Sequence, residues 1–125
     1  HYGDLVGARA LAALRAEIDG IGPWIPSLLR AEPAPDGAGD PRPRLGDGPA
    51  PWLAEARRLG FAVHAYTLRA EAPYRFIDAA GREQSPQAQL RMLVEAGITG
   101  VFADQPALAV EVRETLRATS PPATR

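Results

Sequence analysis

The side chains that could do chemistry gather on two segments in the second half of the chain. His64 and Tyr66 alternate with small aliphatic residues in FAVHAYTL, residues 61–68, and Arg69 follows directly. Phe102 and Asp104 alternate in the same way in GVFADQP, residues 100–106. Because side chains alternate between the two faces of a strand, each segment brings an aromatic residue and a polar group to the same rim of the sheet, at the carboxyl ends of the strands. An arginine there can hold a phosphate, and an aromatic ring can line a ligand pocket.

Each of these residues also has a purely structural interpretation. The mid-strand position of His64 favours a hydrogen-bonded core histidine over a catalytic base, and Tyr66 is equally compatible with interior packing and with ligand contact. Asp104 stands at a helix start, where an N-cap accepts hydrogen bonds from free N–H groups and contributes about 1 kcal/mol, so capping is its favoured role. Arg69 could also extend over the rim or pair with Glu71.

The sequence contains no complete catalytic set. Asp19 stands alone, and divalent-metal hydrolysis needs two or three converging carboxylates. Acid–base cleavage needs a placed histidine or carboxylate pair, which the spacing does not provide. A phosphate-binding glycine loop, a nucleophile elbow and a His-Glu zinc signature are also missing. We therefore expect no catalytic residue and no metal ligand in this segment.

Composition excludes several classes of protein. The 125 residues, 46% of them hydrophobic and 23% charged, correspond to one ordinary domain or to half of a large one. Fifteen acidic residues balance 14 basic ones, so no basic field attracts nucleic acid or anionic lipid. No apolar run approaches the roughly 20 residues of a transmembrane helix. With no cysteine, a disulfide, a thiolate metal site and a cysteine nucleophile are excluded.

The elements that position the candidate residues alternate between helix and strand. Apolar spacing and turn residues predict helices over 5–17, 52–59 and 87–95 and from Pro106 onward, and one or two helical turns over 24–30. The same signals predict strands over 18–23, 61–68 and 98–104. A polar loop with a turn at Ala80–Gly81 is expected over 69–83. This alternation predicts parallel strands with helical crossovers, hence an α/β fold. A (β/α)₈ barrel needs about 250 residues, so this chain would supply half of one.

Two segments lack the composition of a packed element. Residues 31–51 hold six of the 13 prolines and few apolar side chains, so burial cannot offset the entropy of ordering them. We expect an exposed, flexible, disordered loop there. Residues 118–125 are expected to be a disordered tail. The chain opens with His1 and lacks a start methionine and a signal peptide, which suggests a mature end or an excised piece.

Three stretches resemble the C-terminal part of the glycerophosphodiester phosphodiesterases, in their secreted bacterial subclass. DGIGP, residues 19–23, is similar to the sixth strand of the family's barrel. LGFAVHAYTLR, residues 59–69, resembles the seventh strand, with Ala65 in place of the usual proline. GITGVFADQP, residues 97–106, resembles the closing strand, with Thr99 in place of an acidic or amide residue and Ala103 in place of threonine. The resemblance spans about residues 8–113.

The resemblance implies a fold, an activity and a division of roles. Residues 1–117 would form strands six to eight, with their helices, of a (β/α)₈ TIM-type barrel. The parent enzyme would hydrolyse glycerophosphodiesters to glycerol 3-phosphate and an alcohol, with a divalent cation, Ca²⁺ or Mg²⁺. The family's catalytic histidines and metal carboxylates belong to the first five strands, and its His-Arg-Gly motif is absent here, where His1 is followed by Tyr2 and Gly3.

The resemblance assigns substrate contacts, and no catalytic roles, to this segment. Tyr66 aligns with the aromatic residue on the glycerol side of the pocket, and Phe102 is carried over with it. Arg69 and Asp104 occupy rim positions, and Arg69 is counted as substrate-binding. The segment is then a wall of the pocket, inactive without the N-terminal half of the barrel, and the secreted relatives suggest a periplasmic or secreted location. The alternative is a free-standing or truncated non-catalytic α/β interaction domain, with residues 31–51 as a binding element.

Overall fold

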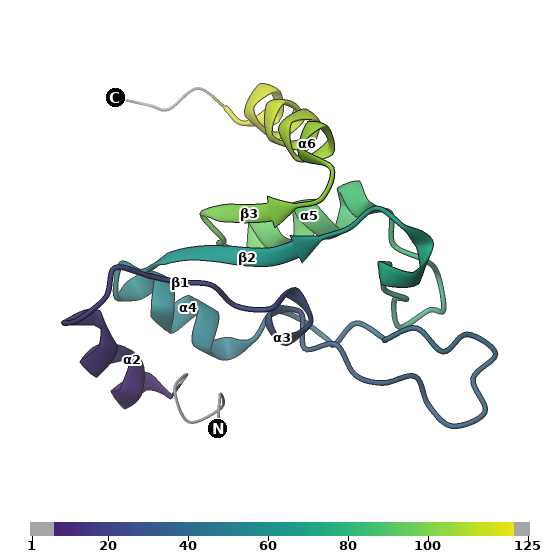
Figure 1. Ribbon diagram of the computed structural model, residues 1–125, viewed down its shortest axis with the longest axis horizontal. Coiled ribbons are helices and arrows are strands. Elements are labelled where there is room, and N and C mark those ends of the chain that lie inside the picture. Colours follow the sequence, from purple (N-terminus) through teal and green to yellow (C-terminus); the bar gives the residue numbers. More distant parts are fainter. Residues whose placement is uncertain (1–6, 122–125) are drawn as a thin grey trace.

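A parallel three-stranded sheet organises the computed structural model, which describes residues 7–121 (Figure 1). Strands β1 (Gly20–Ile21), β2 (Ala62–Leu68) and β3 (Gly100–Ala103) lie side by side in that order. Gly20 pairs with Ala62 and His64 with Gly100, and both strand pairs are parallel. The predicted α/β fold with parallel strands is therefore confirmed. Five α-helices and one 3₁₀ helix connect and cover the strands within the described range.

The five α-helices agree in position with the sequence prediction, whereas the 3₁₀ helix lies in the segment 69–83 that was predicted as a loop. They are α2 (Ala8–Arg15), α3 (Ile25–Leu28), α4 (Pro51–Arg58), the 3₁₀ helix η1 (Ala72–Tyr74), α5 (Pro86–Ala96) and α6 (Pro106–Thr119). The first residues of the helix expected over 5–17, together with His1 and Tyr2, lie outside the described residues. No helix in the described part of the chain is both long and apolar enough to cross a bilayer.

Strand β1 is shorter than the predicted 18–23. Regular pairing ends at Ile21, and Pro23 offers no backbone N–H to the sheet. Contact with β2 resumes at the next residues, because Tyr66 N–H donates to the Pro23 carbonyl at 3.1 Å and Trp24 forms an isolated parallel bridge with Tyr66. Trp24 and Tyr66 are therefore neighbours at the carboxyl end of the sheet.

The sheet buries one of its faces and leaves the other open. Val63 and Ala65 of β2 are fully buried, in a core to which Leu53 of α4 and Leu93 of α5 also belong. The side chains that alternate with them point the other way and stay exposed, 44% for Tyr66 and 58% for Phe102. We call this second surface the open face. In Figure 1 the three strands are drawn one above another, with α6 above β3 and α2 below β1.

Local signals fix the ends of the β2–α5–β3 unit. The Ser85 hydroxyl accepts a hydrogen bond from Ala88 N–H at 3.1 Å, a typical N-cap of α5. Gly97 ends the helix in the left-handed conformation, with φ of 108°. Thr99 then joins the two strands, since its hydroxyl accepts from Val63 N–H at 2.8 Å. This contact explains why a threonine is suitable at a position where the resembling family carries an acidic or amide residue.

The segment 31–51 forms specific contacts with the loop after β2. Glu32 and Arg44 exchange two backbone hydrogen bonds of 2.9 and 2.8 Å, and Leu45 N–H donates to Ile77 O at 2.8 Å. Half-buried Leu45 packs against the core. Gly46 lies so close to Arg30 that an added Cβ would meet its carbonyl oxygen at 2.8 Å. The flexibility of this segment stays a prediction.

The predicted C-terminal tail begins later than expected. Helix α6 extends to Thr119, so residues 118 and 119 are helical, and Ser120 donates its N–H to Leu116 O at 3.0 Å. Residues 122–125 lie outside the described part of the chain.

Candidate pocket wall at the carboxyl ends of the strands

The predicted substrate-binding residues meet at the carboxyl end of the sheet. Tyr66 and Phe102, on adjacent strands, line a shallow hollow of about 510 Å³ together with Thr67, Ala103 and Asp104. Arg69 lies directly after β2 at the same rim. Because parallel strands align their carboxyl ends, residues far apart in sequence form one surface here. The sequence prediction that these residues share a rim agrees with the structure; their role as ligand contacts stays a prediction.

His64 is exposed on the open face rather than buried in the core. Its ring lies 6.4 Å from the Phe102 ring in an edge-to-face arrangement, at an interplanar angle of 67°. The imidazole also covers Gly100, where an added Cβ would meet His64 Cδ2 at 2.7 Å. The prediction of a core histidine was therefore wrong, because the helices cover only the opposite face of β2.

Asp104 pairs with Arg69 instead of capping α6. Its carboxylate oxygen lies 2.9 Å from Arg69 Nε, while the N-cap position of α6 belongs to Gln105, which makes no side-chain cap hydrogen bond. Both side chains of the ion pair are partly exposed, so its own contribution to stability is small. The capping prediction was wrong because the nearest cation, at the end of the adjacent strand, competes for the carboxylate.

The alternative pairing of Arg69 with Glu71 was also wrong. Glu71 accepts a hydrogen bond from Gln105 Nε2 at 3.2 Å, and Gln105 Oε1 accepts from Ala70 N–H at 3.1 Å. Gln105 thus joins the loops that follow β2 and β3. The Arg69 guanidinium instead lies over the ring of Tyr74, 4.6 Å from its centroid, in a cation–π contact.

A second hollow, which we call the rim cleft, adjoins the first. Its volume is about 340 Å³, and Tyr66 and Thr67 line both hollows. Its walls are aromatic and proline residues with three other polar side chains among them: Trp24, Pro26, Pro43, Tyr66, Thr67, Arg69, Pro73, Tyr74, Phe76 and Gln89. The sequence analysis did not identify Trp24, Tyr74 or Gln89 as site residues. Only the bridge between Trp24 and Tyr66 and the folding of residues 69–85 bring them together.

Gln89 is the buried polar residue of the rim cleft. It is 2% exposed, and its Oε1 accepts from Phe76 N–H at 3.2 Å. Its amide nitrogen has no hydrogen-bond partner among residues 7–121. The isolated polar position of Gln89 in the apolar stripe of α5 was the available sequence signal for it.

An ion-pair cluster, which we call the loop clamp, lies behind the rim cleft. Arg42 binds Asp40 at 2.6 Å and Glu83 at 2.5 Å, and Arg75 binds Glu83 at 2.7 Å. Hydrogen bonding to Arg42 lowers the pKa of Asp40 to about 2. Arg42, and after it Arg75, lowers the pKa of Glu83. The loop clamp therefore connects segment 31–51 with the loop that contributes Tyr74 to the rim cleft.

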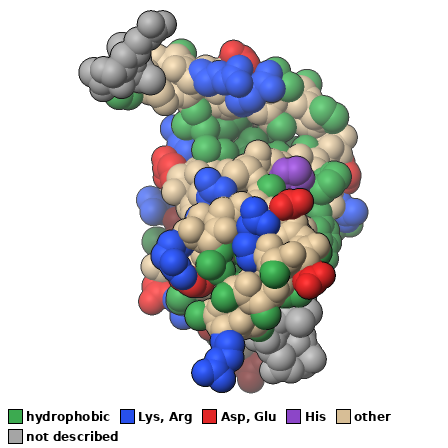
Figure 2. Space-filling view, turned by 90° about the vertical axis from the view of Figure 1, so that its left-hand side faces the viewer, with side chains coloured by type: hydrophobic (Ala, Val, Ile, Leu, Met, Phe, Trp, Pro, Cys, Tyr) green, Lys and Arg blue, Asp and Glu red, His purple; other side chains and the backbone are tan. Residues whose placement is uncertain are grey.

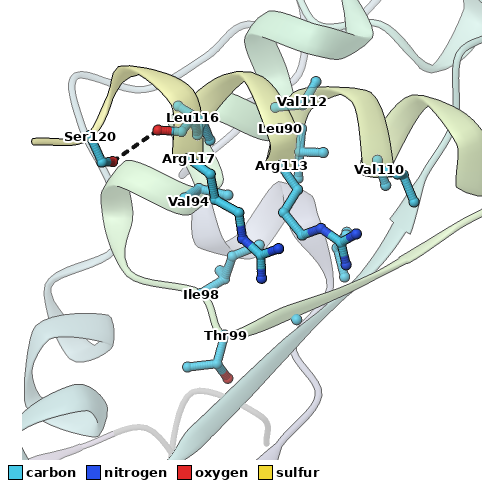
Figure 3. Close-up of a pocket in the computed structure, with 13 residues that line it drawn as sticks. Leu90, Val94, Ile98, Thr99, Val110, Val112, Arg113, Leu116, Arg117 and Ser120 are labelled. Atoms are coloured by element: carbon cyan, nitrogen blue, oxygen red, sulfur yellow. Dashed lines mark hydrogen bonds between the residues drawn. The ribbon is translucent and has the colours of Figure 1, made fainter. Parts of the chain in front are cut away.

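An apolar groove of about 490 Å³ lies on the far side of β3, between α5 and α6. Leu90 and Val94 of α5 and Val110 and Leu116 of α6 line it. In the space-filling view, hydrophobic side chains gather in a hollow below the topmost helix, α6 (Figure 2). The close-up shows Arg113 and Arg117 extending from α6 across the groove toward β3 (Figure 3).

The described residues do not form a cation site. No group of three or more histidine, aspartate and glutamate side chains lies close enough to hold a metal between residues 7 and 121. Asp104, at the end of β3, is engaged by Arg69. The residues of this segment therefore do not fit the divalent cation that the family resemblance implies.

The comparisons with known proteins identify no family for the chain. No model of a protein family matches it, and no curated protein matches its sequence.

Proposed function

We propose that this chain forms the last three strand–helix units of a (β/α)₈ barrel and supplies one wall of a glycerophosphodiester phosphodiesterase pocket. The observation that carries the proposal is the open face, with Tyr66 and Phe102 exposed at the carboxyl ends of parallel strands. In barrels of this type the inward-pointing residues belong to the interior, and the active site lies at the carboxyl ends of the strands.

The unpaired edges of the sheet support the same proposal. Strands β1 and β3 each have only β2 as a neighbour in the described chain, so each presents one unpaired edge. An apolar groove accompanies the β3 edge, where the first strand and helix of a closed barrel would pack. Exposed edges of this kind are normally covered or blocked in free-standing domains.

The segment's own residues would bind and orient the substrate. Tyr66 and Phe102 offer aromatic faces to the glycerol carbons and exclude water from that side of the phosphodiester. Arg69 offers charge-assisted donors to a phosphoryl oxygen. The divalent cation, held by carboxylates of the other strands, would supply Lewis-acid polarisation when bound. No catalytic acid or base is assigned to this chain.

Kinetics of the complete protein test the proposal. We expect the protein translated from the whole reading frame, continued upstream of His1, to release glycerol 3-phosphate from glycerophosphodiesters in the presence of Mg²⁺ or Ca²⁺. Tyr66→Ala should raise KM about tenfold and leave kcat within about threefold, because binding energy for the glycerol is lost in ground and transition states alike. Arg91→Met, at an exposed position of α5 away from both hollows, is the control.

Two outcomes would contradict the proposal. One is the absence of glycerol 3-phosphate release with either cation, which would favour the non-catalytic interaction domain. The other is a Tyr66→Ala variant with unchanged kinetics, which would remove Tyr66 from the pocket. The coding sequence upstream of His1 provides an independent check, since we expect a His-Arg-Gly motif and paired acidic residues there.

A further inference from the structure

The rim cleft has the walls of a second binding site beside the hollow that would hold the glycerol. Trp24, Tyr66 and Tyr74 are 57%, 44% and 51% exposed, an unusual amount of accessible aromatic surface for three residues around one hollow. Aromatic faces bind apolar C–H surfaces by dispersion. The cleft shares Tyr66 and Thr67 with the hollow at Phe102, so a single elongated ligand could occupy both.

Two side chains of the rim cleft, Gln89 and Arg69, offer hydrogen-bond donors to a ligand. The amide nitrogen of Gln89 lies in a side chain that is 98% buried and has no partner in the described part of the chain, while its oxygen is already engaged by Phe76 N–H. Arg69 Nε is also buried, and its approach to Asp104 does not have hydrogen-bond geometry. Arg69 Nε is the buried donor without a hydrogen bond, and the Gln89 amide nitrogen is unpaired among the described residues, so a ligand that supplies acceptor oxygens would be favoured.

The same cleft disfavours a cationic ligand. Arg69 covers the Tyr74 ring at 4.6 Å, so the ring face that could attract an ammonium group is already occupied by a guanidinium. No acidic side chain among the described residues lines the rim cleft to offset a second positive charge. A choline or ethanolamine group would therefore meet the Arg69 guanidinium with no acidic side chain among the described residues that line the cleft.

From these contacts we infer that the rim cleft binds an uncharged polyol. Its C–H faces would pack on Trp24 and Tyr66, and its hydroxyl oxygens would accept hydrogen bonds from Gln89 and Arg69. The identity of this ligand rests on the proposed function: it is the head-group alcohol of the phosphodiester. The preferred substrates are then glycerophosphodiesters of polyols, such as glycerophosphoinositol and glycerophosphoglycerol, rather than those of choline or ethanolamine.

Substrate competition in the complete protein tests this inference. We expect kcat/KM for glycerophosphoinositol to exceed that for glycerophosphocholine about tenfold. Gln89→Leu and Tyr74→Ala should each reduce this ratio at least threefold, because they remove a donor and an aromatic wall without touching the hollow at Phe102. Arg91→Met, away from both hollows, should keep the ratio. Calorimetric titration with free myo-inositol and free choline gives a second readout that does not depend on catalysis.

The outcomes separate this inference from the proposed function. Hydrolysis of both substrates at equal rates, or a preference for glycerophosphocholine, would overturn the polyol site and leave the phosphodiesterase proposal standing. If neither substrate is hydrolysed, the phosphodiesterase proposal fails, and calorimetry then tests whether the rim cleft binds a polyol. Saturable binding of myo-inositol that Gln89→Leu abolishes would then support the polyol site, and no binding would overturn it.

Discussion

At the scale of single residues, two phenylalanines on opposite sides of the sheet provide a test of whether the open face is exposed. Phe61 is fully buried in the core, whereas Phe102 is 58% exposed on the open face. Phe61→Ala should lower the free energy of unfolding by about 3–5 kcal/mol, because it leaves a cavity in packed surroundings. Phe102→Ala should change it by about 0.5 kcal/mol or less. Urea denaturation of both variants measures the contrast, and equal losses would show that the open face is covered within the chain.

The residue-level predictions succeeded where they depended on alternation along one strand. The separation of His64 and Tyr66 from Val63 and Ala65 follows from strand geometry alone and agrees with the exposed fractions. The partner of Asp104 could not be predicted in this way. The local capping rule predicts that Asp104 caps the helix that follows it. Its carboxylate instead lies 2.9 Å from Arg69 at the end of the adjacent strand, a contact created by strand pairing.

At the scale of elements, acid should weaken the loop clamp. Arg42 lowers the folded-state pKa of Asp40 from 3.8 to about 2, and it lowers that of Glu83 from 4.5. Carboxyls with a lowered pKa stabilise the folded state above their unfolded pKa and lose that contribution as pH falls through the folded value. The difference in Tm between the parent chain and Arg42→Met should therefore be largest above about pH 5 and shrink between pH 4.5 and 2.

A matched substitution distinguishes the loop clamp from general acid sensitivity. Arg91→Met replaces an exposed arginine of α5 that forms no ion pair with the described residues, so its Tm should follow that of the parent chain at every pH. A pH-independent difference for Arg42→Met would show that Arg42 acts through its packing or its bond to Ala72 O rather than through the carboxylates.

The elements themselves were largely predictable because their signals are local. Ser85 at the N-cap of α5, Gly97 at its end and Pro106 in the first turn of α6 each act within a few residues. The contacts of segment 31–51 were not predictable, since its bridge from Arg44 to Ile77 joins two loops that the sequence places far apart. The rim cleft escaped prediction for the same reason. Its aromatic residues come from three segments and have no shared spacing.

At the scale of the whole molecule, residues 7–121 form a helix-covered sheet that has, within this range, one uncovered side and two free edges. Val63, Ala65 and Leu68 give the sheet a conventional core on the helical side. The open face instead exposes aromatic rings, and the groove between α5 and α6 exposes Val94 and Val110. Isolated apolar side chains are ordinary on protein surfaces, but contiguous ones beside an unpaired strand edge indicate a surface that is covered in use.

The last prediction concerns the chain of 125 residues by itself. With one face and two strand edges open, it should associate as its concentration rises, because pairing and burial lower the free energy of those surfaces. Analytical ultracentrifugation between about 1 and 100 μM should show a rising average mass. Phe102→Asp, which places a charge on the open face, should shift association to higher concentration, whereas Arg91→Met should not. A cooperative, concentration-independent melt of a monomer would contradict the idea that these strands require further strands to complete their fold.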